Sequence, residues 1–424
     1  MRLMKKIFNF LLVICISSIG ADRINFLGQD SSFTITPFLT ISIFISAILL
    51  LFFRRKIFFN QKSIYLFICL FFGLLSCILF SVFFSNDMFI SLKRFILLIV
   101  LIISSFLLYL SLCVNRNNRE MLFIASLLGV IINFIFSIAQ FFYFLNGKFD
   151  GYVWNVIDMN ILSYGGFGLR LSGSCQDPNR GAFILSFYLF CILNFKDQYK
   201  SHFAKCCINF ILIINVLTIL ITLSRTGYVC LFLVTFFYLR DKKNIIVLIN
   251  IFLVISIIFF LGGVLSSGIE FDNFDIVKMF NERVSSDSNS SEIHKGLISI
   301  GFNLIFSSFK ILFFGIGYGA SYTVLNNIFD DNTKVNNFHS FYLSMVVESG
   351  IISLLFFAII IIIAYKNSKQ FKPLILMTLF FNVFYQLNAE PLFWFLLIIS
   401  FFNINDNSIA IYSKTNLFLK RFYK

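Results

Sequence analysis

The sequence predicts an all-α polytopic membrane protein with about twelve transmembrane helices, in a range of roughly ten to twelve. Of the 424 residues, 59% are hydrophobic and 13% are charged, and the mean hydropathy is +0.90. An ordinary soluble domain has about 25% charged residues. The apolar residues form long runs, and short clusters of Lys and Arg separate these runs, as in chains that cross a membrane repeatedly.

The predicted spans follow from the length that a helix needs to cross a bilayer, about 20 apolar residues. They are 7–21, 33–53, 63–85, 94–114, 121–145, 181–195, 205–223, 226–240, 244–263, 340–365, 372–388 and 391–404. The first follows a basic start and ends in small residues, which is also typical of a secretory signal peptide. Because so many spans follow, we interpret it as an uncleaved first helix.

The basic clusters predict the topology. They lie in alternate short connections, at 2–6, 54–62, 116–119, 196–205, 240–243, 366–372 and 414–424. The positive-inside rule places these connections and both termini in the cytoplasm. We expect residues 1–424 to form one integral membrane domain.

The opposite face carries two long outer loops, at 146–180 and 265–339. Within the second, residues 296–319 are apolar but interrupted by Ser, Asn, Lys and Gly. This pattern predicts a helix on the outer membrane surface, with a re-entrant segment as the alternative.

Several function classes lack support in the sequence. The net charge of +14 is not gathered on one face with interleaved aromatic residues, so no nucleic-acid partner is expected. Of the nine cysteines only Cys175 lies in a loop, and no phosphate-binding, dinucleotide or metal-ligand motif occurs. We therefore expect no cofactor and no metal.

Charged residues predicted on the outer side are the candidates for a site. Arg170 and Arg180 flank an Asp-Pro-Asn turn that opens a helix, where Asp177 and Asn179 can accept backbone hydrogen bonds. Together with the helix N-terminus, the two guanidinium groups would suit an anion. Arg225 lies in the turn LSRTG and has a planar fork that matches phosphate. The plainer interpretation is a capped helix with arginines that reach lipid headgroups.

His339 and Glu348 lie at the start of the span after the second outer loop. Nine residues correspond to a net rotation of about 180°, so the two would lie on opposite sides of a straight helix. His339, near the surface, suits a general base, and Glu348 is better placed to hold another segment. A capping or interfacial histidine is the alternative.

The order of these motifs resembles the O-antigen polymerase and O-antigen ligase superfamily, over roughly residues 120–365. The matching motifs are R-x-x-G…P-N, S-R-T, G-x-G and H-S-x-Y-L…E-x-G. They comprise Arg170, Gly173, Pro178, Asn179, Ser224, Arg225, Thr226, Gly315, Gly317, Gly319, His339, Ser340, Tyr342, Leu343, Glu348 and Gly350. Arg170 to Gly181 and His339 to Gly350 both fit the Arg-x(10)-Gly pattern, or its His variant, that polymerases of this kind carry.

The resemblance implies a metal-independent membrane glycosyltransferase of the C-type class in the bacterial inner membrane, with its active site facing the periplasm. Its donor would be an oligosaccharide on undecaprenyl diphosphate within the membrane lipid, and a chain-length regulator protein is a further partner that this function allows. Arg170 and Arg225 would stabilise the leaving diphosphate, and His339 would be the general base. Arg180, Arg283, Glu348 and Tyr342 would contact or orient the substrate.

A polymerase is the favoured member of this superfamily. Ser353 stands where ligases prefer Gly, Thr or Tyr, and the composition, rich in Phe, Ile and Asn, is typical of variable surface-polysaccharide genes. The alternatives are an O-antigen ligase, which transfers the glycan to lipid A core, and a polysaccharide flippase or other transporter. A transporter would predict internal repeats and broken helices near mid-membrane, and neither is evident in the sequence.

Overall fold

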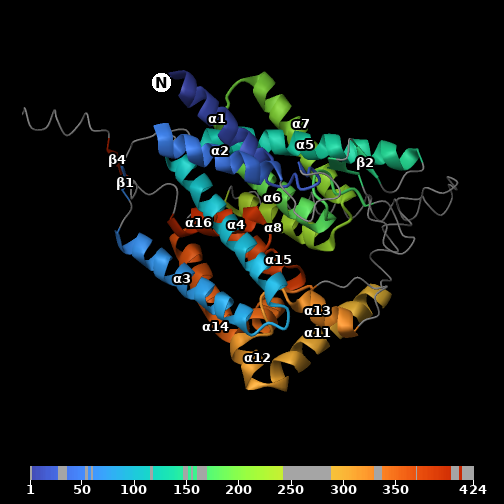
Figure 1. Cartoon of the computed structure of the whole chain (residues 1–424). Helices are drawn as coiled ribbons and strands as arrows, with labels where there is room; N and C mark the ends of the chain where they lie inside the picture. Colours follow the sequence, from blue (N-terminus) through green and yellow to red (C-terminus); the bar gives the residue numbers. More distant parts are fainter. Residues whose placement is uncertain are drawn as a thin grey trace, which may run out of the picture. The chain divides into compact units, whose positions relative to one another are not determined.

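The computed structural model describes the following residues: 2–26, 36–52, 56–58, 61–114, 118–146, 151–153, 156–159, 170–241, 288–328, 337–368, 370–402 and 410–412. Arg283 and the predicted span 244–263 lie outside them. Each of the other predicted spans overlaps a helix (Figure 1). The chain divides into two compact units, unit 1 with residues 1–42 and 117–289, and unit 2 with residues 43–116 and 290–424.

The prediction of an all-α membrane protein is confirmed in that the chain is mostly helical and contains long apolar helices. Among the described residues, five helices are long and apolar enough to cross a membrane. They cover Ser63–Phe83, Met88–Cys113, Asn118–Leu145, His202–Ile221 and Phe341–Asn367.

Unit 1 is a helical bundle with a short antiparallel hairpin. Its elements are α1 (Arg2–Ser17), the start of α2 (Pro37–Phe52), α5 (Asn118–Leu145), β2 (Tyr152–Val153), β3 (Ile157–Asp158), α6 (Pro178–Phe195), the 3₁₀ turn η1 (Lys196–Gln198), α7 (His202–Ile221) and α8 (Arg225–Asp241).

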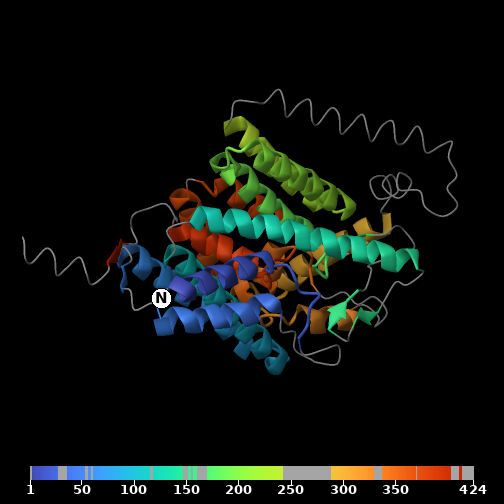
Figure 2. The same ribbon diagram turned by 90° about the horizontal axis from the view of Figure 1, so that it is seen from above.

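Helix α6 is the centre of unit 1. It packs against α5, α7 and α8 (Figure 2). Nearly all of its side chains are buried. A helix that is apolar all round is stable when neighbours cover it on every side. Helix α1 packs along α5, and Tyr188 of α6 donates a hydrogen bond to the carbonyl of Ile16 at 3.0 Å. The loop predicted at 146–180 therefore leads into a rigid element.

Unit 2 contains the remaining helices and a second short ribbon. Its elements are the rest of α2, β1 (Lys56–Phe58), α3 (Gln61–Phe83), α4 (Met88–Val114), α11 (Ser288–Ser307), α12 (Phe309–Phe314), α13 (Ser321–Ile328), α14 (Phe341–Asn367), α15 (Lys372–Phe384), α16 (Pro391–Phe402) and β4 (Ala410–Tyr412), which pairs antiparallel with β1.

Helix α16 has the central place in unit 2. All of its side chains are buried, and it packs against α4, α14 and α15. Helix α14 packs along α3 and α12, as seen in Figure 1. Large apolar side chains on the outer faces of these helices stay exposed, for example Phe72 at 71% and Phe80 at 59%. Such faces suit contact with lipid, since hydrocarbon is as apolar as the side chains.

The segment predicted to form one surface helix, 296–319, is interrupted. It begins within α11, breaks at Ser308 and continues as α12 before a glycine-rich turn. The Ser308 hydroxyl accepts the backbone N–H of Ile311 at 3.2 Å and so caps α12. Phe302 is 51% exposed and Phe306 is 77% exposed, so α11 has an apolar face that the described part of unit 2 leaves uncovered.

Helix α14 is not regular throughout. Gly350 has φ 79° and ψ 166°, which interrupts the helical backbone. A side chain at this position would collide with the carbonyl of Phe313 in α12. Glycine is therefore required at position 350 for two reasons: the positive φ of the backbone and the close approach of two chain segments.

We predict that Gly350→Ala lowers the free energy of unfolding by at least about 1–2 kcal/mol, because an L-residue is strained at this φ. The measurement is thermal unfolding of the full chain in detergent. Gly296→Ala in α11 is the matched control, since nothing lies within 4 Å of the added carbon. Equal midpoints for the two variants would contradict the strain argument.

Candidate functional site

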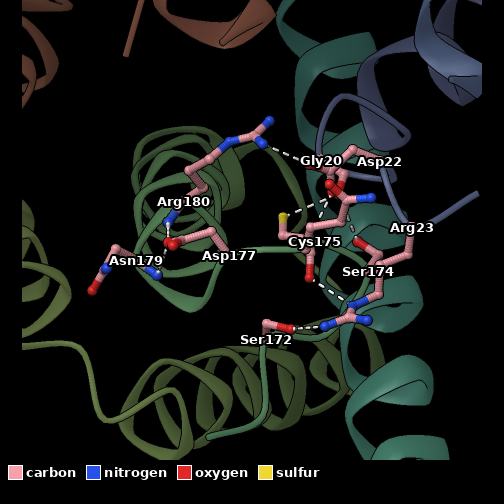
Figure 3. Close-up of polar contacts among 10 residues, drawn as sticks. Gly20, Asp22, Arg23, Ser172, Ser174, Cys175, Asp177, Asn179 and Arg180 are labelled. Atoms are coloured by element: carbon pink, nitrogen blue, oxygen red, sulfur yellow. Dashed lines mark hydrogen bonds and ion pairs between the residues drawn. The ribbon is translucent and has the colours of Figure 1, made fainter. Parts of the chain in front are cut away.

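The start of α6 is capped as the sequence predicts. The Asp177 carboxylate accepts the backbone N–H groups of Asn179 at 2.7 Å and Arg180 at 3.1 Å (Figure 3). Pro178 fits the first helical turn, where no backbone N–H is needed. The N-terminal donors of α6 are therefore engaged by Asp177, which sets the direction of the chain as it enters the helix.

Asn179 connects two of the sequence motifs. Its Oδ1 accepts hydrogen bonds from Arg170 Nη2 at 3.2 Å and from the Ser224 hydroxyl at 2.8 Å. Arg170 Nε also donates to the carbonyl of Thr222 at 3.2 Å. The R-x-x-G…P-N and S-R-T motifs, which are about 50 residues apart in sequence, are thus in direct contact within unit 1. The prediction that Asn179 accepts backbone hydrogen bonds at the start of α6 is wrong for its side chain, which joins these motifs instead.

The S-R-T turn presents Arg225 to the outside of unit 1. Leu223 adopts a left-handed conformation with φ 49°, and the Ser224 hydroxyl accepts the N–H of Gly227 at 3.0 Å, which starts α8. Arg225 is exposed, whereas Arg170 is only 5% exposed. Of these two predicted catalytic arginines, Arg225 is therefore the one accessible on unit 1 itself.

A third arginine, which the sequence analysis did not single out, organises this region. Arg23 is 1% exposed and lies between the segment after α1 and the first outer loop (Figure 3). It donates to the Cys175 carbonyl at 2.7 Å, the Asp158 carbonyl at 2.9 Å and the Ser172 hydroxyl at 2.6 Å. Burial lowers the pKa of Arg23, and the nearby Asp158 carboxylate, at 3.6 Å, opposes that shift.

The neighbouring Asp22 determines where Arg180 points. Its carboxylate forms an ion pair with Arg180 Nη1 at 2.6 Å and accepts the backbone N–H of Gln176 at 2.8 Å. Arg180, predicted to bind substrate, is thus held by a protein carboxylate. In the sequence, the available signal for Asp22 and Arg23 was that two charged residues directly follow an apolar helix. Their partners could not be predicted, because they lie about 150 residues away.

Polar side chains of α5 support the same loop from the other side. Gln140 accepts the N–H of Gly173 at 3.1 Å, and Asn133 accepts the Ser174 hydroxyl at 2.9 Å. Asn133 and Gln140 are fully buried in the unit. Polar groups of this kind next to apolar surroundings are stabilised by each other's hydrogen bonds.

Glu348 of unit 2 binds the glycine-rich turn that follows α12. Its carboxylate accepts the N–H of Gly319 at 3.0 Å and the hydroxyl of Ser321, the first residue of α13. Its backbone carbonyl accepts the N–H of Gly317 at 3.1 Å. Glu348 is 3% exposed, so it holds the turn rather than facing solvent. The G-x-G and H-S-x-Y-L…E-x-G motifs are therefore also paired in space.

His339 and Tyr342 lie close to this arrangement in the chain but make different contacts. His339 precedes α14 with φ 52°, and its N–H donates to Asn337 Oδ1 at 2.8 Å. It lies outside the helix, so the expected half-turn relation to Glu348 along one straight helix does not hold. Tyr342 donates to the Leu379 carbonyl at 2.9 Å, which ties α14 to α15.

A polar cavity of about 240 Å³ opens beside Glu348 in unit 2. Its lining residues come from α4, the glycine-rich turn, α13, the segment before α14, α14 itself and the connection between α15 and α16. The polar lining residues are Arg94, Tyr318, Tyr322, Asn337, Glu348, Tyr385, Gln386 and Asn388. Arg94, at the start of a predicted span, is not among the site residues predicted from the sequence. In the described part of the chain, no group of three or more His, Cys, Asp or Glu could hold a metal ion.

We predict that Arg23→Ala lowers the free energy of unfolding by about 3–5 kcal/mol, because it leaves Asp158 and two backbone carbonyls without their buried cation. Thermal unfolding in detergent measures this loss. Lys200→Ala, at an exposed position of unit 1, is the control and should change the midpoint little. A stable Arg23→Ala protein would show that the buried hydrogen bonds are not needed to hold the loop.

A comparison with protein-family models gives no match to this chain, and a comparison with curated proteins gives none either. The family resemblance therefore rests on the motifs in the sequence. What the structure adds is that these motifs pair with one another, two in each unit.

Proposed function

We propose that the chain is an O-antigen polymerase, a membrane glycosyltransferase that joins repeat units carried on undecaprenyl diphosphate at the outer leaflet of the bacterial inner membrane. The observation that carries the proposal is the pairing of motifs. Arg170 contacts Asn179, which contacts Ser224 of the S-R-T turn, and Glu348 contacts the G-x-G turn. Within each unit, motif residues far apart in sequence form a hydrogen-bonded arrangement, and this supports a shared role of the motifs in that unit.

The chemistry suits arginine and histidine without a metal. The acceptor hydroxyl oxygen forms a bond to the anomeric carbon of the donor and gives its proton to a general base, for which His339 is our candidate. The bond between that carbon and the diphosphate oxygen breaks, and the lipid diphosphate leaves with the electron pair. Arg225 is exposed and can stabilise this negative charge with a bidentate contact.

Contacts within each unit support the proposed topology of about twelve spans with both termini in the cytoplasm. Arg23 contacts Asp158, and both are assigned to the periplasmic side. Phe123 stacks on Tyr199 with ring centroids 4.8 Å apart, and both belong to cytoplasmic ends. In unit 2, Asn388 contacts Tyr318 at 3.1 Å, again between two outer connections.

The test of the function is the lipopolysaccharide profile of a deletion strain, with lipid-linked glycan extracted in parallel. Lipid A core capped with a single repeat unit is the result expected for a polymerase. Bare core together with long polymer left on undecaprenyl diphosphate would identify a ligase instead. An unchanged ladder would reject both and favour a transporter.

We predict that Arg225→Ala lowers polymer formation about 10²–10³-fold, the loss usual when one transition-state donor is removed. Arg225→Lys should keep part of the activity, because it retains the charge but not the fork. Arg240→Ala, at the other end of α8, is the control. Polymer yield in the complemented strain, relative to the amount of protein in the membrane, is the measurement. Normal yield from Arg225→Ala would remove Arg225 from the mechanism.

We predict a comparable loss for His339→Ala, about 10²–10⁴-fold, since a general base contributes that much. The measurement is the same polymer yield. Asn337→Ala removes the acceptor for the backbone N–H of His339 but leaves the imidazole in place, so it should cost less. If the two losses were equal, the role of His339 would be to shape the turn before α14.

A further inference from the structure

The cavity of unit 2 has an unequal supply of donors and acceptors. Both Glu348 oxygens are already used, by the Gly319 N–H and the Ser321 hydroxyl. Gln386 Oε1 accepts the Ser344 hydroxyl at 3.4 Å, which leaves its amide N–H groups as the donors of that side chain. Each of these oxygens can accept one more hydrogen bond, but the donors of the Arg94, Gln386 and Asn388 side chains outnumber them, so acceptor oxygens on a ligand would match the lining.

Arg94 gives this cavity its positive charge. Its side chain is exposed, and its stem packs against Gly319, where any larger residue would collide with it. Gly319 has φ 76°, and Glu348 holds its N–H, so the turn that supports Arg94 is fixed. Among the described residues, no hydrogen bond engages the Arg94 guanidinium. The group is therefore held at the cavity by its stem, and its donors are available.

Tyrosine side chains complete the lining. Tyr318, Tyr322 and Tyr385 all border the cavity. Burial raises the pKa of Tyr318, and the Glu348 carboxylate adds to the rise, so its hydroxyl stays protonated. Asn388 donates to that hydroxyl oxygen at 3.1 Å, so the Tyr318 proton is directed to another acceptor. Ring faces beside amide and hydroxyl groups suit a sugar ring, which has apolar C–H faces and polar edges.

The charge and size of the cavity narrow the ligand further. Arg94 is the only cation among its lining residues, and the Glu348 carboxylate lies at the same cavity. Any anionic ligand would meet both Arg94 and Glu348 here, and a carboxylate, with a single negative charge, would be repelled less by Glu348 than a diphosphate, which carries more than one. A volume of about 240 Å³ is below the roughly 300–1,000 Å³ of pockets for drug-sized ligands and fits one sugar ring.

We propose that the unit 2 cavity binds one sugar residue that bears a carboxylate, a uronic acid of the glycan, with Arg94 pairing with the carboxylate and the amides of Gln386 and Asn388 contacting the ring hydroxyls. This inference rests on the proposed function, since that function makes a glycan the ligand. It assigns Arg94 a part in specificity, not in the transfer step.

The test is binding of small probes to the purified full chain in detergent, followed by saturation-transfer NMR and titration. Glucuronate should bind, and Arg94→Gln should raise its dissociation constant about tenfold or more, because a charge-assisted pair is lost. Lys93→Gln, one residue earlier on α4 and not in the lining, is the matched control. The thermal midpoint of each variant separates loss of binding from loss of folding.

Two results would overturn the inference. If glucose bound as well as glucuronate, and Arg94→Gln had no effect, the carboxylate would not be recognised. If inorganic pyrophosphate bound more tightly than glucuronate, the cavity would be a site for the lipid diphosphate. Because binding needs no turnover, its failure is distinguishable from failure of the proposed function. A deletion strain with the polymerase profile but no glucuronate binding rejects this inference alone, and binding with an unchanged ladder rejects the function alone.

Discussion

Polar groups in a chain this apolar must find partners inside the protein, and this requirement shapes the loops that carry the candidate residues in both units. An unsatisfied polar group next to hydrocarbon costs several kcal/mol. In unit 1 the buried Arg23 meets this requirement by donating hydrogen bonds to three acceptors from two separate segments. In unit 2 the buried Glu348 meets it by accepting hydrogen bonds from the Gly319 N–H and from the hydroxyl of Ser321 at the start of α13. One cation and one anion thus anchor the two polar regions.

Glycine makes the second arrangement possible. Gly315, Gly317, Gly319 and Gly350 all have positive φ, and added side chains at these positions would meet neighbouring chain segments. The turn after α12 can therefore lie directly on the backbone of Glu348, which brings Arg94 and Tyr318 to one cavity. A bulkier turn would separate α12 from α14 and leave the carboxylate without its donors.

The helices could be predicted from the sequence to a large extent, because each is a long apolar run bounded by charges or turns. The N-cap at Asp177 was predictable for the same reason, since the Asp-Pro-Asn pattern acts over a few residues. Arg23 and Arg94 were not predictable in this way. Their partners lie far away in sequence, and an isolated arginine at the end of an apolar run is indistinguishable from one that contacts lipid headgroups.

The irregular backbone was the other part that periodicity could not reveal. His339 has φ 52° and lies before α14, so rotation per residue does not give the relation between His339 and Glu348. Gly350, two residues after Glu348, interrupts α14 itself. Sequence spacing assumes a uniform helix, and the departure at Gly350 lies where α14 closely approaches α12. Close packing between two distant segments is what overrides the local preference.

The different burial of the arginines in unit 1 bears on which of them touches a substrate. Arg170 is 5% exposed and binds Asn179 and the Thr222 carbonyl. Its guanidinium thereby fixes the backbone that leads into the S-R-T turn. Arg225, directly after that turn, is exposed and begins α8. If the proposed function holds, this geometry makes Arg170 a positioning residue that would act through Arg225. The two arginines of the motifs would then have different roles. Arg170 would hold the turn in place, and Arg225 would stabilise the negative charge of the leaving diphosphate.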